Sequence, residues 1–207
     1  LVNMGAYVLV FPDKKYASTA DPSDFGCLEA SFPGEVAVTL TPCSLEGADR
    51  LPDFVQSTEP TKPANKALWL DTSFHPQVLK EWSAASGLWV TVQTAYVRLS
   101  APGIGKDFRL YDGVTIQGAG ELDGGNALWL VTEDSLVISG VLAGKTTVEQ
   151  GLRVMRQVPE MDYVIQCGNR LWGCRYGPDR KGQTVNEIYA SALGDFRNWQ
   201  RFQGLST

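Results

Sequence analysis

The apolar residues of this sequence come in short runs, and no stretch repeats them with the 3.6-residue period of an amphipathic helix. The runs are rich in β-branched and aromatic residues and are closed by Gly, Pro, Asn, Asp or Ser, a pattern typical of strands bounded by turns. This pattern predicts an all-β protein. Strands are expected at residues 6–11, 35–41, 67–70, 78–82, 88–92, 113–118, 127–131, 136–142, 146–155, 163–165, 170–176 and 187–193.

The spacing of these runs predicts two kinds of module. Residues 67–92 hold three runs, which predicts a three-stranded meander after a Pro-rich, linker-like loop at 52–65. The dipeptide Leu-Trp recurs at 88, 128 and 171, with offsets of 40 and 43 residues that are close to the repeat of propeller blades. Another Leu-Trp at 68 breaks this rhythm. We therefore expect a small β-barrel and meander module inserted in part of a β-propeller-like sheet array.

Three segments follow from this expectation. Residues 1–33 are predicted to be a propeller-like strand segment, and residues 151–207 a propeller-like blade. Residues 34–150 are the inserted small β domain, with a meander at 34–100 and barrel strands at 101–150. Within the blade, residues 177–182 are expected to form a charged hairpin loop, and the indole of Trp199 is expected to fill the space between blades.

Charge excludes some functions and leaves others open. The 207 residues carry 18 Lys+Arg and 23 Asp+Glu, and this net charge of −5 argues against a general nucleic-acid binder. No apolar run is long enough for a transmembrane helix, so membrane insertion is not expected. Residues 1–150 have a net charge of −8 and residues 151–207 of +3. This split can steer parts of the chain or neighbouring subunits toward each other, or it can be local surface variation.

The residues that usually carry chemistry are scattered. His75, the single histidine, lies in a polar run that reads as a turn, so we expect an exposed side chain rather than a catalytic base. Neither the nucleophile-elbow pattern nor a phosphate-binding loop is present. We therefore expect no enzyme activity, no catalytic residues and no cofactor.

The four cysteines show no metal-ligand spacing, so no metal site is expected. Free cysteines usually behave as buried small hydrophobes. A Cys167–Cys174 disulfide across adjacent strands is conceivable, but reduced thiols are favoured in a protein assembled in a cytoplasm. The cysteines are Cys27, Cys43, Cys167 and Cys174.

An alternative hypothesis is that the chain binds a host-surface glycan, and its candidate binding residues lie in the meander. Trp69, Trp82 and Trp89 could form a strip on which a host-surface glycan stacks, with Asp71 and Glu81 as hydrogen-bond acceptors. Core packing is the favoured interpretation of these indoles, because burying one removes a large apolar area from water. Hydrolysis of a glycan would need two carboxylates about 5–10 Å apart, and Asp162 with Glu187 is the least implausible pair.

The last third of the chain carries the most distinctive motif. Residues 158–165 lead to Asn169-Arg170-Leu171-Trp172-Gly173-Cys174, then to residues 186–199 and the end at 202–207. Together with residues 4–7, 11–16, 19–21 and 111–118, this motif resembles a family of tail or virion-structural proteins from tailed bacteriophages and prophages of gut Firmicutes. The resemblance covers nearly the whole chain and is most specific at 169–199.

The resemblance implies a propeller-like body interrupted by a small barrel that opens at residues 111–118. It also implies a non-enzymatic structural domain, made in the bacterial cytoplasm and located in the phage tail. Its partners would be other tail or virion proteins, with self-association as a possibility. Relatives run beyond both ends of this chain, which starts at Leu1, so we expect a domain of a longer protein.

Overall fold

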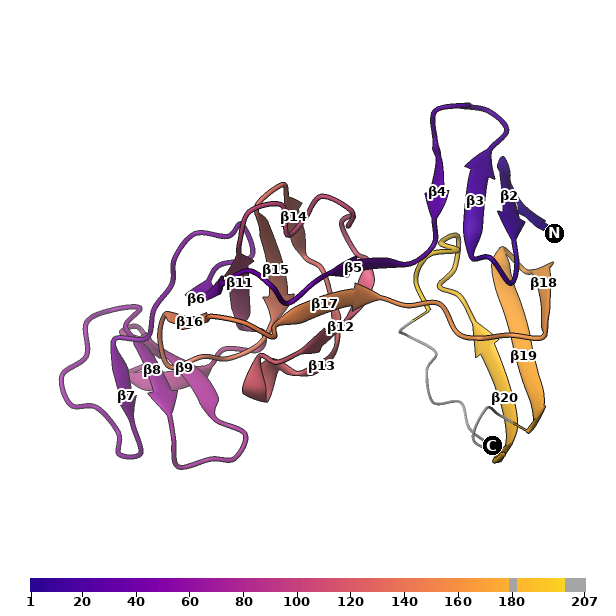
Figure 1. The fold of residues 1–207 in the computed structure, drawn as a ribbon. Helices are drawn as coiled ribbons and strands as arrows, with labels where there is room; N and C mark the ends of the chain where they lie inside the picture. Colours follow the sequence, from indigo (N-terminus) through magenta and orange to yellow (C-terminus); the bar gives the residue numbers. More distant parts are fainter. Residues whose placement is uncertain (179–181, 200–207) are drawn as a thin grey trace. The chain divides into compact units, whose positions relative to one another are not determined.

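The computed structural model describes residues 1–178 and 182–199. Within these residues the chain forms β-strands and one short 3-10 helix, η1 (Gly120–Leu122), and it contains no α-helix (Figure 1). The all-β class is therefore confirmed. The sheets of the described residues form no closed barrel.

The chain divides into two compact units and passes from one to the other four times. Unit 1 contains Leu1–Phe32, Asp112–Thr115 and the described part of Val154–Thr207. Unit 2 contains Pro33–Tyr111 and Ile116–Arg153. Unit 1 is thus assembled from segments that are far apart in the sequence, and its stability depends on contacts between those segments.

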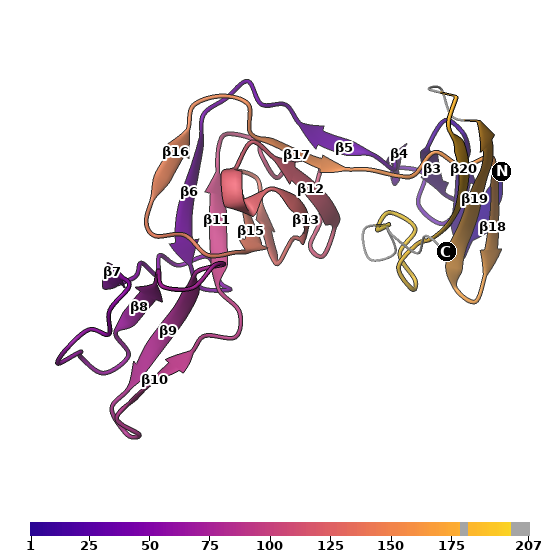
Figure 2. The same cartoon turned by 90° about the horizontal axis from the view of Figure 1, so that it is seen from below.

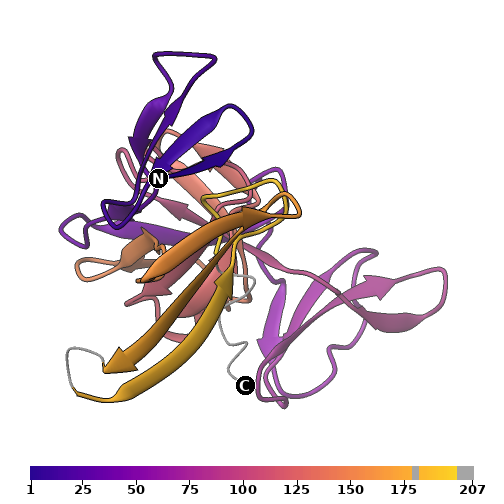
Figure 3. The ribbon, with the colours of Figure 1, turned by 90° about the vertical axis from the view of Figure 1, so that its right-hand side faces the viewer.

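Unit 1 contains two antiparallel sheets. The first has the strand order β1-β2-β3-β4 and the second the order β18-β19-β20, with β19 and β20 joined as a long hairpin (Figure 3). The expected hairpin loop at 177–182 falls partly outside the described residues. The strands are β1 (Val2–Met4), β2 (Tyr7–Val10), β3 (Lys15–Ser18), β4 (Phe25–Cys27), β18 (Tyr163–Cys167), β19 (Arg170–Pro178) and β20 (Thr184–Ala190).

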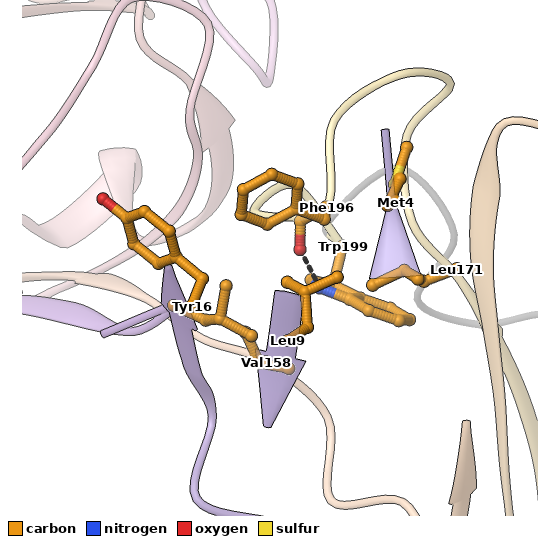
Figure 4. Close-up of a cluster of buried hydrophobic side chains, with 8 residues drawn as sticks. Met4, Leu9, Tyr16, Val158, Leu171, Phe196 and Trp199 are labelled. Carbon is orange, nitrogen blue, oxygen red and sulfur yellow. Dashed lines mark hydrogen bonds between the residues drawn. The ribbon is translucent and has the colours of Figure 1, made fainter. Parts of the chain in front are cut away.

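The core of unit 1 lies between these two sheets. Side chains alternate between the faces of a strand, so Leu9 of β2 and Leu171 of β19 both point inward and are fully buried. Trp199 is buried in the same cluster, and its Nε1 donates to the Phe196 carbonyl at 2.9 Å (Figure 4). Each sheet therefore uses one face for the core and leaves its other face outside. The buried cluster is completed by Met4, Tyr16, Leu28 and Val158.

Unit 2 is built mainly from two sheets. One has the order β14-β15-β11-β6-β16, and the other is the meander β10-β9-β8 extended by β7 (Figure 2). The predicted meander is confirmed, because β8 pairs antiparallel with β9 and β9 with β10. The strands are β6 (Val38–Cys43), β7 (Phe54–Gln56), β8 (Leu68–Asp71), β9 (Val78–Ser83), β10 (Leu88–Thr91), β11 (Tyr96–Ser100), β14 (Leu130–Thr132), β15 (Ser135–Ser139) and β16 (Thr146–Val148).

A further sheet has the order β13-β12-β17-β5. Its strands are β5 (Ala30–Phe32), β12 (Gly113–Gln117), β13 (Gly124–Ala127) and β17 (Arg153–Arg156).

Several strand predictions need correction. The loop at 52–65 contains β7, which pairs parallel with β8. The run 127–131 is interrupted, because the chain leaves β13 after Ala127 and enters β14 at Leu130. The run 146–155 forms β16 and β17, separated by a turn in which Gly151 has a φ of +90°, a conformation that residues with a side chain rarely adopt. Strands β1, β3, β4, β5 and β11 were not predicted.

A buried ion pair joins the three segments of unit 1. Arg156 lies on β17 and Asp112 just before β12, and their side chains are 5% and 4% exposed. Arg156 Nη1 donates to Asp112 Oδ2, and Arg156 Nε donates to the Leu28 carbonyl at 2.9 Å. One guanidinium therefore holds residues from 1–32, 112–115 and 154–199 together.

Replacing Asp112 with Asn should destabilise the fold because it leaves the buried Arg156 charge uncompensated. We expect the free energy of unfolding, measured by urea denaturation, to fall by about 3–5 kcal/mol. The double variant D112N/R156M should lose less than D112N, since the unpaired charge is gone. Glu81→Gln, which breaks the more exposed ion pair between Arg50 and Glu81, is the control and should cost about 1 kcal/mol or less. Equal losses for D112N and the double variant would contradict this role.

Candidate functional site

The three tryptophans proposed for glycan stacking lie on one face of the meander. Trp89 pairs in register with Trp82, and Trp69 pairs with Lys80 on the same face. The ring of Trp89 packs edge-on, with its centroid 5.4 Å from that of Trp69 and 5.4 Å from that of Trp82. Trp69 is only 4% exposed, while Trp82 and Trp89 are half-buried. The rings therefore pack mainly against one another.

The two carboxylates proposed as acceptors are on opposite faces of this sheet. Asp71 shares the tryptophan face, where Lys80 Nζ lies 2.8 Å from Asp71 Oδ2 and 4.6 Å from the centre of the Trp69 ring. Glu81 faces the other way and forms an ion pair with Arg50. Burial disfavours the charged form of Asp71, but hydrogen bonds from Lys80 and Ser73 outweigh it and lower the pKa of Asp71 below its ordinary value. Asp71 is thus a structural anion.

One polar atom of the tryptophan face lacks a partner. Trp89 Nε1 is buried and has no hydrogen-bond acceptor among the described residues. By contrast, Trp69 Nε1 donates to the Gln56 carbonyl at 2.9 Å. A buried donor without an acceptor is uncommon in folded proteins, so Trp89 Nε1 could donate a hydrogen bond to a ligand oxygen.

His75 is exposed in the turn between β8 and β9, as expected. It lines an open cavity of about 570 Å³ together with Glu121, Asp123 and Asn126. Asp123 Oδ1 accepts a hydrogen bond from the Ala119 amide at 2.6 Å, and Asn126 Nδ2 donates to the Ser139 carbonyl at 2.8 Å. These polar groups therefore hold the loop around η1. No cluster of three or more metal-ligating side chains occurs within residues 1–178 and 182–199.

The carboxylates of the proposed hydrolytic pair are both engaged in local structure. Asp162 Oδ2 accepts a hydrogen bond from the Tyr176 amide at 3.1 Å. Glu187 accepts one from Tyr189 Oη, and burial together with the Glu187 charge raises the pKa of Tyr189 to about 12. Arg175 stands opposite Glu187 in the β19–β20 register. Glu187 therefore takes part in interactions on its own sheet, with Tyr189 on the same strand and Arg175 on the neighbouring strand.

All four cysteines are free thiols. Cys167 is opposite Arg170 and Cys174 is opposite Tyr163, so the register of β18 and β19 does not place the two cysteines as partners. The expectation of buried cysteines holds for Cys43 and is wrong for Cys27 and Cys167, which are exposed on the outward faces of β4 and β18.

The outer face of β18–β20 carries several large, exposed apolar side chains. We define it by Tyr163, Ile165, Trp172, Cys174, Tyr176 and Ile188, which alternate with the residues that point into the core. Tyr163 is 77% exposed, Ile165 65% and Ile188 55%. All of these side chains except that of Tyr176 border an apolar groove of about 490 Å³. A contiguous apolar sheet face of this kind marks an interaction site more often than a free surface.

The inner face of the same sheet is also apolar, because it packs into the core of unit 1. Leu171 and Val164 point inward, and Gly173 allows Met161 to pack closely, since a Cβ at Gly173 would lie 2.0 Å from Met161 Sδ. Both faces of β18 and β19 therefore carry apolar side chains, and the described residues cover only one of them. The sequence signal for this feature was the unbroken apolar run Tyr163-Val164-Ile165, which is typical of a strand buried on both sides.

No protein-family model, curated protein or solved structure matches the chain. Within the described part of the chain, no helix is both long enough and apolar enough to cross a bilayer.

The Asp71–Lys80 ion pair should make the free energy of unfolding depend on pH in the acid range. Because folding lowers the pKa of Asp71, its stabilisation is complete above the ordinary value of 3.8 and is lost as the pH falls through the lowered value. We expect Asp71→Asn to lower the free energy of unfolding by about 2 kcal/mol at neutral pH. The deficit should shrink as urea titrations are taken below pH 3.8. Glu59→Gln, at an exposed loop position, is the control, and a pH-independent deficit would contradict the assignment.

Proposed function

We propose that this chain is a non-enzymatic assembly module of a tail-associated virion protein from a tailed bacteriophage or prophage. The observation that supports the assembly role is the outer face of β18–β20, where large apolar side chains stay exposed on the sheet. Leaving such a face in water costs free energy that contact with a partner recovers. The virion setting rests on the sequence resemblance of residues 169–199.

The rest of the molecule supports a scaffold role. The candidate acids and acceptors are engaged in the fold, Asp71 with Lys80 and Glu187 with Tyr189. In this proposal the two sheets of unit 1 are neighbouring blades of a propeller-like body, and unit 2 is the module inserted between their strands. Apolar contact between sheet faces is the interaction that such a body needs.

The proposed location can be tested on tailed particles from the bacterium that carries the gene. Antibodies raised against the purified chain should label the tail in electron micrographs of these particles. An epitope-tagged chain carrying Ile188→Asp should fold but fail to be incorporated, because a charge in the apolar face opposes docking. Particles without label, with the chain recovered only from the soluble fraction, would overturn the proposal.

One observation favours a second function, the binding of a host-surface glycan. Trp89 Nε1 is a buried donor without an acceptor among the described residues, and Trp82 beside it is partly exposed. A sugar hydroxyl could accept this hydrogen bond while the sugar ring stacks on Trp82.

Glycan arrays and cell-wall pull-downs test this second function directly. If it is correct, Trp82→Ala should lose retention through loss of the stacking surface, and Trp89→Phe should lose it through loss of the N–H while keeping an aromatic ring. Trp129→Phe, a tryptophan outside the meander, is the matched control. Equal and negligible retention of the wild type and all variants would remove the glycan reading.

A further inference from the structure

Strand β10 has an open edge in the meander of unit 2. It is the outermost strand of the order β10-β9-β8-β7 (Figure 2). The Val92 amide donates to the Leu79 carbonyl, so residues 88, 90 and 92 direct their backbone groups toward β9. The backbone groups of Trp89 and Thr91 therefore point outward, and no other described strand pairs with them.

This edge lacks the features that usually protect an edge strand. Proteins prevent edge strands from pairing with another chain by charged residues, by proline or by making the strand very short. Among the described sheets, every other edge strand except β1 has a charged residue within it or directly beside it. Strand β1 is three residues long and lies beside β18. Around β10, by contrast, residues 82–97 contain no Asp, Glu, Lys, Arg or Pro.

The side chains near this edge are apolar, and the closest charges are already paired. Leu88 is 63% exposed and Val90 52%. On the neighbouring strand β9, Glu81 forms an ion pair with Arg50, and Lys80 forms one with an aspartate of β8. A strand that approaches β10 therefore meets apolar side chains and free backbone groups rather than an unpaired charge.

We propose that β10 pairs antiparallel with β10 of a second copy of this chain, about a two-fold axis beside Val90, so that the two meanders form one continuous sheet. The backbone groups of an edge strand take another extended strand as their partner, which defines the occupant. The inference uses only unit 2, and it goes beyond the assembly role proposed for β18–β20.

The sequence of β10 fits a second copy of itself. With the axis beside Val90, Trp89 lies opposite Thr91 of the second copy, and the two residues exchange both main-chain hydrogen bonds. Val90 lies opposite Val90 of the second copy, and Leu88 lies opposite Val92, so the cross-strand pairs on that face are apolar. Within the bounds of β10, this is the two-fold register that pairs both outward-facing residues.

The composition of the edge favours an identical partner. Short, uncharged segments with high β-propensity and without proline pair readily with identical segments of other chains. Two copies of residues 82–97 bring no like charges together, which is the usual obstacle to contact between identical surfaces. Because each copy contributes the same strand, the contact is isologous and closes at the dimer.

The wild-type chain should show a monomer–dimer equilibrium in sedimentation velocity and light scattering. Hydrogen exchange of the Trp89 and Thr91 amides should slow as the concentration rises, since these amides become bonded in the dimer. Val90→Lys should weaken dimerisation by about tenfold or more, because it places two like charges directly opposite each other. Val55→Lys, on the opposite edge of the same sheet at a position 46% exposed, is the matched control and should dimerise like the wild type.

Mixing two charge variants is the decisive experiment. Val90→Lys and Val90→Glu should each be monomeric alone, since each repels its own copy. An equimolar mixture should form a 1:1 heterodimer, because the two-fold register places Lys opposite Glu. Circular dichroism and urea unfolding establish that all variants are folded, and rescue in the mixture could not come from misfolded chains.

Other outcomes would overturn the inference in distinguishable ways. A wild-type chain that stays monomeric at every concentration would remove the second copy as partner. Dimerisation that persists in Val90→Lys but is lost in Ile188→Asp would place self-association on β18–β20 instead. Loss in both Val90 variants without rescue in the mixture would exclude the pairing of Val90 with itself. Tail labelling tests the proposed assembly function separately, so the failure of one does not decide the other.

Discussion

The buried cluster that the two sheets of unit 1 share is the interaction on which the rest of this structure depends. The sheets come from opposite ends of the described chain, so neither can bury its apolar face until the other is present. The Arg156 guanidinium joins Leu28 to Asp112 at the point where the three segments meet, and Trp199 is buried in the shared cluster. Long-range closure of this kind is entropically costly, and the combined burial of both sheets offsets it.

Each sheet of unit 1 has two faces, of which one packs into the core and the other is available for the proposed assembly role. Packing β1–β4 against β18–β20 satisfies one face of each sheet. The outward residues of β18, β19 and β20 remain as apolar as the inward ones, which is expected of a sheet with neighbours on both sides. The proposed assembly role therefore rests on the outer face of β18–β20, where the described residues leave large apolar side chains exposed.

The sequence predicted the all-β class and the meander because β8, β9 and β10 have short apolar runs with clear turns between them. It did not reveal β3 and β4, where Lys15, Ser18 and Gly26 show no periodic pattern and extended structure arises from pairing with β2. Strand β7 was hidden in a Pro-rich loop, and its place depends on tertiary contacts such as the bond from Trp69 Nε1 to the Gln56 carbonyl. The open face could not be identified either, since Val164 and Ile165 are both apolar and only the structure shows which one is covered.

The comparison of the two aromatic-rich surfaces shows why residue type is a poor guide to function here. In the sequence, Trp69, Trp82 and Trp89 were the candidate glycan-binding residues. In the structure, the rings of Trp69 and Trp82 pack edge to face against Trp89, and Lys80 lies against Trp69. On β18–β20 the less conspicuous Tyr163 and Ile188 project from the sheet and remain largely exposed. Apolar area that already has partners contributes to stability, whereas apolar area without them contributes free energy only when another surface covers it. The distinction between a packing cluster and a docking face thus lies in which side chains the fold leaves uncovered.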